Sequence, residues 1–113
     1  MATRYYLRLR DPARARAGGQ FPFTAHGAEE FAAQLQQALR SDALFERWRQ
    51  AQEDPDAVDR SLAATDPDAT VSGSQHDLHI DLVATTRLPG RVFQHRMRLL
   101  AGSAWELVDV TAA

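Results

Sequence analysis

Residues 76–84 read HDLHIDLVA, residues 92–100 read VFQHRMRLL and residues 105–110 read WELVDV. Apolar and polar side chains alternate in all three stretches, and a period of two is typical of strands with one buried face. Leu88-Pro89-Gly90 and Ala101-Gly102-Ser103 separate them as turns. The sequence therefore predicts a three-stranded antiparallel meander. The side chains expected to face inward are Leu78, Ile80, Leu82, Ala84, Phe93, His95, Met97, Leu99, Trp105 and Leu107.

The chemistry of the last two stretches predicts their register. Pairing Leu100 with Ala104 leaves a three-residue loop that contains glycine, a common hairpin length. This register keeps apolar side chains on one face and opposite charges on the other, whereas a one-residue slip would mix them. The expected pairs are Leu99 with Trp105, Met97 with Leu107, Arg98 with Glu106 and His95 with Asp109.

The N-terminal half predicts one further strand and the helices that cover the sheet. Tyr5, Leu7 and Leu9 alternate with polar residues, which indicates a strand at the sheet edge. Apolar residues at helical spacing predict a helix over residues 28–40 and a second to about residue 52, or one bent helix over both. A short third helix is expected over residues 55–62.

The fold class that follows is α+β, in the order β-α-α-(α)-β-β-β. An antiparallel sheet of about four strands carries two or three helices on one face, because a sheet with one apolar face needs a cover. We expect residues 1–113 to form a single domain.

The composition excludes several classes of chemistry. The 113 residues include no cysteine, which excludes disulfides, thiolate metal sites and thiol catalysis. All 13 basic residues are arginine, which excludes a P-loop lysine and Schiff-base catalysis. We expect no cofactor. No stretch has the apolar length of a membrane span or a signal peptide, so we expect a cytoplasmic protein with no membrane partner.

Charge is distributed unevenly along the chain. Arginines gather near the N-terminus, and acidic residues gather over residues 53–68. One interpretation is weak nucleic-acid binding through the arginine-rich segment, with Arg8, Arg10, Arg14 and Arg16 as candidates. The other, which we favour, is mutual attraction of the two segments, because no aromatic residue is interleaved among these arginines and the net charge is −2.

Histidines offer two candidate sites. The predicted register sets His95 opposite Asp109, as in a dyad at a pocket between helices and sheet, although no serine or second acid completes a catalytic set. We therefore also consider His95 as a core residue. Asp77, His79 and Asp81 share one predicted strand face, where they would either ligate a metal or form a solvated face neutralised by arginine.

The outer face of the predicted sheet carries more apolar residues than a solvent-exposed face usually does. The leading hypothesis is therefore a non-catalytic protein-interaction module that forms a homodimer through this face. The predicted interface residues are Val83, Val92, Arg96, Arg98, Leu100, Val108 and Val110.

Overall fold

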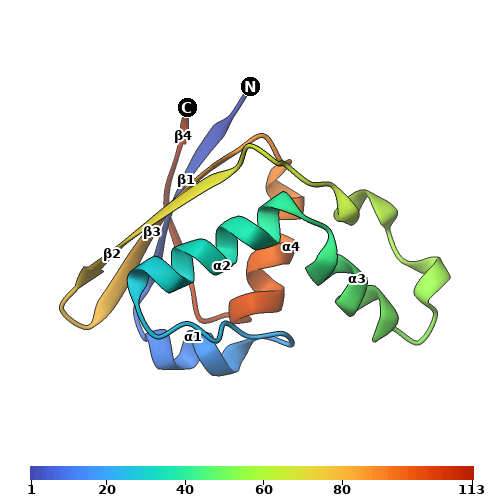
Figure 1. Cartoon of the computed structure of the whole chain (residues 1–113), viewed down its shortest axis with the longest axis horizontal. Coiled ribbons are helices and arrows are strands. Elements are labelled where there is room, and N and C mark those ends of the chain that lie inside the picture. Colours follow the sequence, from blue (N-terminus) through green and yellow to red (C-terminus); the bar gives the residue numbers. More distant parts are fainter.

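The computed structural model describes residues 1–113, and its elements run β-α-α-α-β-β-α-β along the chain (Figure 1). The strands are β1 (Thr3–Leu9), β2 (Thr70–His76), β3 (His79–Thr86) and β4 (Glu106–Ala112). The helices are α1 (Pro12–Gly18), α2 (Ala28–Arg40), α3 (Ala43–Gln50) and α4 (Gly90–Ala101), and two 3-10 helices are η1 (Pro55–Ala57) and η2 (Arg60–Ala63).

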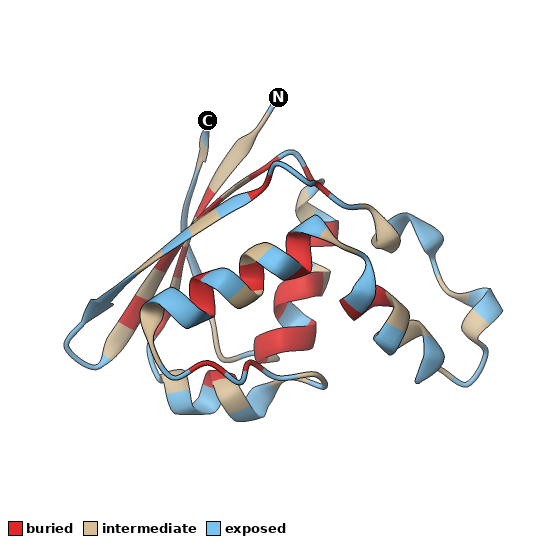
Figure 2. Ribbon diagram, viewed as in Figure 1, coloured by how far each residue is buried: buried red, intermediate tan, exposed pale blue.

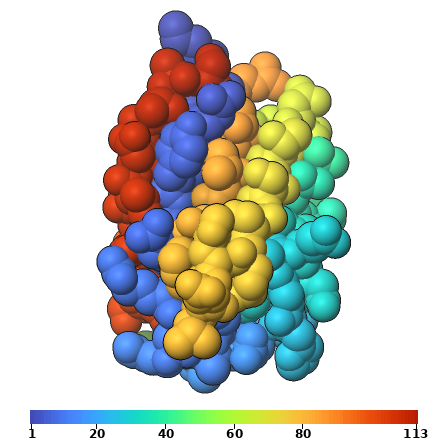
Figure 3. Space-filling model, turned by 90° about the vertical axis from the view of Figure 1, so that its left-hand side faces the viewer, coloured from blue at the N-terminus to red at the C-terminus, as the bar shows by residue number.

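The four strands form one antiparallel sheet in the order β2-β3-β1-β4. Leu7 of β1 lies opposite Leu82 of β3 on one side and opposite Leu107 of β4 on the other. The helices lie on one side of this sheet (Figure 1), and its other face is a surface of strands (Figure 3). The predicted α+β class with helices on one face is confirmed, although β1 lies inside the sheet rather than at its edge.

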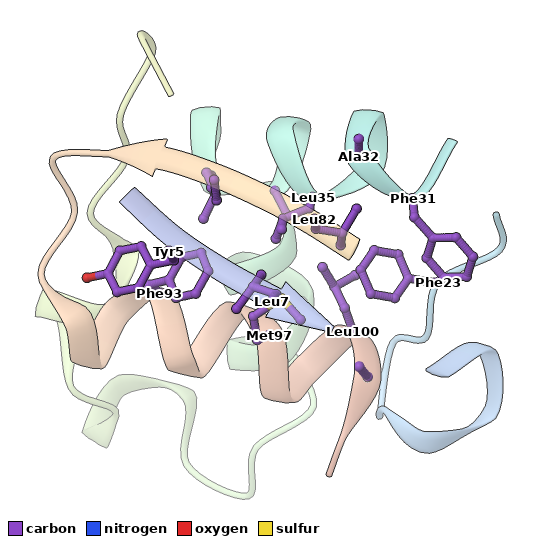
Figure 4. Close-up of a cluster of buried hydrophobic side chains, with 14 of the residues drawn as sticks. Tyr5, Leu7, Phe23, Phe31, Ala32, Leu35, Leu82, Phe93, Met97 and Leu100 are labelled. Carbon is purple, nitrogen blue, oxygen red and sulfur yellow. The ribbon is translucent and has the colours of Figure 1, made fainter. Parts of the chain in front are cut away.

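The core lies between the sheet and the helices. Figure 2 shows burial concentrated on α4, on one side of α2 and on the central strands. The ring of Tyr5 stacks on that of Phe93 at 4.2 Å between centroids, and Leu7 and Met97 lie close to them (Figure 4). Each fully buried side chain of this size stabilises the fold by about 1.5–3 kcal/mol. The inward-facing residues of the two central strands are Tyr5, Leu7, Leu9, Ile80, Leu82 and Ala84, as the alternation predicts.

Leu78 departs from that alternation. It lies with Asp77 in the two-residue turn between β2 and β3, where its side chain is 85% exposed. Asp77 has a φ of 52°, in the left-handed region, which aspartate tolerates better than most residues. The prediction that Leu78 faces the core is wrong because the strand begins one residue later, at His79.

The predicted strand over residues 92–100 is wrong, because these residues belong to α4. Pro89 precedes the helix, and Gly102 with a φ of 61° ends it, so the two predicted turns are a helix start and a helix stop. None of the predicted pairs between residues 95–100 and 104–109 forms, and β4 pairs with β1 instead. The buried side chains of α4 follow a helical stripe: Val92, Phe93, Arg96, Met97, Leu99, Leu100 and Ala101.

The strand β2, the helix α1 and the segment over residues 55–62 also differ from the sequence-based expectations. The strand β2 was not predicted, because its sequence TVSGSQH has a single large apolar residue. Residues 28–50 form two helices, with Ser41 ending the first. The expected helix over residues 55–62 is replaced by η1 and η2, and residues 12–18, which carry no apolar stripe, form α1. None of the helices combines the length and the apolar character needed to cross a membrane.

Candidate functional site

The uncovered face of the sheet, here called the outer face, is the largest surface that the fold leaves without a layer of helices. In Figure 3 the strands cross this face in the order β4, β1, β3 and β2. Alternate side chains of β1 and β3 point to it because their neighbours in sequence face the core. These outer-face side chains are Arg4, Tyr6, Arg8, His79, Asp81, Val83 and Thr85, and all of them are partly exposed.

A hollow of about 270 Å³ lies on the outer face. Tyr6, Val83 and Val108 contribute apolar surface to it, and Arg8 and Asp81 contribute charge. An apolar floor with charges around it is typical of a contact surface for a protein.

The charges beside the hollow are already paired. Arg8 Nε donates to Asp81 Oδ1 at 2.9 Å. This hydrogen bond is the main reason that the pKa of Asp81 lies below its usual value, and His79 and His76 lower the pKa further. The Nε2 atoms of His76 and His79 lie 3.5 and 3.6 Å from Asp81 Oδ2.

This cluster lacks the geometry of a catalytic triad. Ser74 Oγ lies 2.9 Å from His76 Nε2, the same nitrogen that approaches Asp81. A triad needs the hydroxyl and the carboxylate on different ring nitrogens, so that the acid can hold the base in the required tautomer.

The edge strand β4 carries exposed apolar side chains. Leu107, Val108 and Val110 are 43%, 51% and 45% exposed, although large apolar side chains are seldom left this open together. The register of β4 on β1 shifts between Tyr6 and Leu7, which leaves Val108 as the extra residue of a bulge. Val108 lines the outer-face hollow, whereas Val110 lies opposite Tyr5 and thus on the side of the helices.

The structure separates the seven predicted interface residues. Val83 and Val108 line the outer-face hollow, whereas Val110, predicted on the same face, lies opposite Tyr5 and points to the side of the helices. The prediction is wrong for the α4 residues: Val92, Arg96 and Leu100 are buried beneath the sheet. Arg98 is exposed on α4, away from the outer face.

Arg96 is the largest fully buried side chain. Its guanidinium donates to the main-chain carbonyl oxygens of Ala38, Leu62 and Ala64. Burial lowers the pKa of Arg96 from its usual value. Its role is thus structural: it joins α4 to the last turn of α2 and to the segment around η2.

The predicted dyad of His95 and Asp109 is wrong. His95 lies on α4, where its ring meets the ring of Trp48 edge-on at 4.6 Å and its Nδ1 is buried without a hydrogen-bond partner. Asp109 is exposed on β4, and its carboxylate accepts a hydrogen bond from the N–H of Val110. The sequence sets these two residues opposite each other only if residues 92–100 form a strand, whereas they lie in α4.

The predicted metal ligands do not converge either. Asp77 lies in the hairpin turn, and His79 and Asp81 have His76 rather than Asp77 as their neighbour. No group of three or more His, Asp or Glu side chains has an arrangement that could hold a metal ion.

Three of the four candidate arginines line one cavity. Arg8, Arg10 and Arg14 surround a space of about 160 Å³ that Trp105 also lines, whereas Arg16 lies outside it and donates to the carbonyl oxygen of Ala25. The sequence does not predict Trp105 as a neighbour of these arginines, because only the fold brings the start of β4 to the end of β1.

Sequence analysis also missed Asp66, which is 4% exposed. Its carboxylate accepts hydrogen bonds from the Thr86 hydroxyl and from the N–H groups of Arg87 and Asp68. Asp66-Pro67-Asp68 resembles Asp54-Pro55-Asp56, and in both the first aspartate caps the N–H two residues later. Asp66 is also buried and accepts hydrogen bonds from Thr86 and Arg87, so it joins its loop to the end of β3.

Comparison with known proteins adds no relative to this description. No family model matches the chain, and neither a curated protein nor a solved structure resembles it significantly.

Proposed function

We propose that this protein is a non-catalytic interaction module that forms a homodimer through the outer face of its sheet, with β4 in the contact. The observation that carries the proposal is the distribution of exposed apolar side chains. Five large apolar residues are exposed in the whole chain, and three of them, Leu107, Val108 and Val110, lie on the edge strand β4. Val108 lines the outer-face hollow with Tyr6 and Val83, whereas Leu107 and Val110 lie opposite Leu7 and Tyr5 and point to the side of the helices. Covering Val108 and the hollow with a partner is favourable, because it removes apolar surface from water.

The charges of the outer face favour a second copy of this chain as the partner. Arg4 of β1 and Asp109 of β4 belong to this face, because Arg4 lies opposite Thr111 and Asp109 lies opposite Tyr6. Neither side chain takes part in an ion pair within the chain. A two-fold axis brings the same patch of both copies together, so Arg4 of each copy can meet Asp109 of the other.

The polar groups near the hollow support binding rather than catalysis. Asp81 is held by Arg8, and Ser74 and Asp81 approach one nitrogen of His76, so no nucleophile is activated. A neutralised ion pair at the rim of an apolar contact contributes to orientation and specificity. The cytoplasmic location expected from the sequence stays a prediction.

The mass of the protein in solution tests the proposal. Light scattering after size exclusion, at micromolar concentration, should give twice the mass of the chain. Val108→Asp should give the monomer mass, since it places a charge in the contact. Leu78→Asp is the matched control, because Leu78 is exposed at the hairpin tip and away from β4, and this variant should remain a dimer.

Two outcomes contradict the proposal. The first is a wild-type chain that stays monomeric at micromolar concentration. The second is a dimer that Val108→Asp leaves intact while circular dichroism shows that the variant is folded.

A further inference from the structure

The cavity between the end of β1, the first turns of α1 and the start of β4 holds more arginines than any other hollow of the molecule. It has a volume of about 160 Å³, and the charged groups around it are Arg8, Arg10, Arg14, Asp11 and Glu106. This is about five times the share of one water molecule in the liquid, which is about 30 Å³. A tetrahedral anion fits such a space.

The arginines that line this cavity keep donors free. Arg8 bonds Asp81 and Arg10 bonds Glu106, and both use Nε only, at 2.9 and 3.0 Å. Their terminal amino groups have no partner in the chain. Arg14 uses its main-chain N–H, which Asp11 caps, and its guanidinium makes no hydrogen bond. Three guanidinium groups, two of them already oriented by carboxylates, thus have unused donors beside one space.

An aromatic wall distinguishes this cavity from an ordinary basic surface. Trp105 lines it, and its indole is partly buried against the core. Trp105 Nε1 donates to the carbonyl oxygen of Gly102 at 3.1 Å, which fixes the orientation of the ring. A fixed indole beside free guanidinium groups offers both a stacking surface and a place for an anion.

We infer that this cavity binds the phosphate group of a small phosphate monoester that carries a planar ring, as in a nucleoside monophosphate. Arginine presents paired N–H donors that match phosphate oxygens, and the indole stacks on the ring. Asp11 and Glu106 in the lining oppose a larger negative charge. They therefore select a single phosphate over a polyphosphate or a nucleic-acid backbone.

The quenching of Trp105 fluorescence measures this binding. Trp48→Phe removes the other indole, so that the signal reports on the cavity alone. Adenosine monophosphate should quench the fluorescence at lower concentration than inorganic phosphate, and adenosine without phosphate should have no effect. A single-stranded oligonucleotide, used as a fourth probe, should bind no more tightly per phosphate than the mononucleotide.

Matched variants assign the binding to the cavity. Arg14→Gln should weaken adenosine monophosphate about tenfold, equivalent to about 1.4 kcal/mol. Arg16→Gln removes the same charge from the same helix but outside the cavity, and it should leave the affinity within about twofold. Trp105→Leu lacks the reporting indole, so its binding is measured by isothermal titration calorimetry, and its affinity for adenosine monophosphate should fall to that for inorganic phosphate.

Three results would overturn the inference. One is the absence of quenching by adenosine monophosphate up to about 10 mM. Another is an equal loss of affinity in Arg14→Gln and Arg16→Gln, which would indicate attraction by overall charge. The third is binding of the oligonucleotide alone, which would indicate a nucleic-acid surface. Arg8 lines both this cavity and the outer-face hollow, but Val108 lines only the hollow, so Val108→Asp should bind the mononucleotide as the wild type does.

Discussion

Arg96 Nε on α4 donates a hydrogen bond to the main-chain carbonyl oxygen of Ala38 on α2 at 3.0 Å. Ala38 lies in the last turn of α2, where carbonyl groups lack partners within the helix and carry partial negative charge. Leu62 and Ala64 accept from the terminal amino groups of the same guanidinium. A single buried cation thus satisfies three carbonyl groups from segments that are distant in sequence.

Replacing Arg96 by methionine should destabilise the protein by about 2–4 kcal/mol, because the carbonyl groups that it satisfies stay buried without a donor. Arg96→Lys should recover only part of this loss, since an ammonium group cannot reach all three carbonyls. Urea unfolding at neutral pH measures both variants. Arg98→Met on the exposed side of α4 is the control and should change stability by less than about 0.5 kcal/mol. A stability loss as small as this in Arg96→Met would contradict the role given to Arg96.

The burial of Arg96 also explains why the sequence predicts a strand over residues 92–100, where the structure has α4. Val92, Phe93, Arg96, Met97 and Leu100 form a helical stripe, but arginine is rarely fully buried, so the sequence favours a pattern that leaves it outside. The alternation of Phe93, Met97 and Leu99 then becomes the better match to a strand. The true stripe contains a residue whose burial depends on carbonyl partners far away in the chain.

Burial at β1 and β3 could be predicted, because their alternation depends only on neighbouring residues. The strand β2 could not be predicted, because Gly73 faces α2 and an added Cβ there would clash with the carbonyl oxygen of Ala28. The helix packs directly on the backbone of β2 at this position. The sequence therefore has a glycine where an apolar side chain would otherwise indicate a strand. The predicted pairing of His95 with Asp109 required residues 92–100 to form a strand. It is wrong because these residues form α4.

Asp66 should contribute stability that depends on pH. Burial raises the pKa of Asp66, but hydrogen bonds from the Arg87 N–H, the Thr86 hydroxyl and the Asp68 N–H lower it more, and the net pKa lies below its usual value. The stability that the carboxylate contributes is therefore fully present above its unfolded-state pKa of about 3.9. It is lost as the pH falls through the lower pKa of the folded state.

Asp66→Asn should destabilise the protein by about 1–3 kcal/mol at neutral pH, because one carboxylate oxygen accepts from both Thr86 and Arg87. Below a pH of about 3.9 the difference from the wild type should shrink. Urea unfolding across this range measures it. Asp68→Asn, at a side chain that is 80% exposed, should show neither effect. A difference that is constant with pH would rule out the carboxylate charge as its source.

His95 should destabilise the protein when it is protonated. Burial lowers the pKa of His95 from its usual value, and the nearby Arg96 and Arg98 lower it further. The neutral ring contributes stability that is fully present above the unfolded-state pKa of about 6.5 and is lost as the pH falls through the folded-state pKa. His95→Gln should therefore lose less stability than the wild type between about pH 8 and pH 5.

His26→Gln is the control for His95, because His26 is exposed, and this variant should keep the pH dependence of the wild type. The fluorescence of Trp48, whose ring meets His95 at 4.6 Å, gives a second measurement. It should change with the protonation of His95 in the wild type but not in His95→Gln. Equal pH dependence of the wild type and His95→Gln would contradict this account.

The proposed dimer predicts a charge exchange between Arg4 and Asp109. Each residue lies on the outer face without an ion pair in its own chain. Arg4→Asp and Asp109→Arg should each weaken the dimer about tenfold, because like charges then meet across the two-fold axis. The double variant carries the same pair in reverse and should recover most of the affinity, since every pair in the contact is again of opposite sign.

Sedimentation equilibrium at low ionic strength measures the three variants, and the differences should shrink in salt. Each single substitution lies on the surface and should leave the free energy of unfolding of the monomer within about 0.5 kcal/mol. Losses that simply add in the double variant would show that the two residues do not meet across the interface.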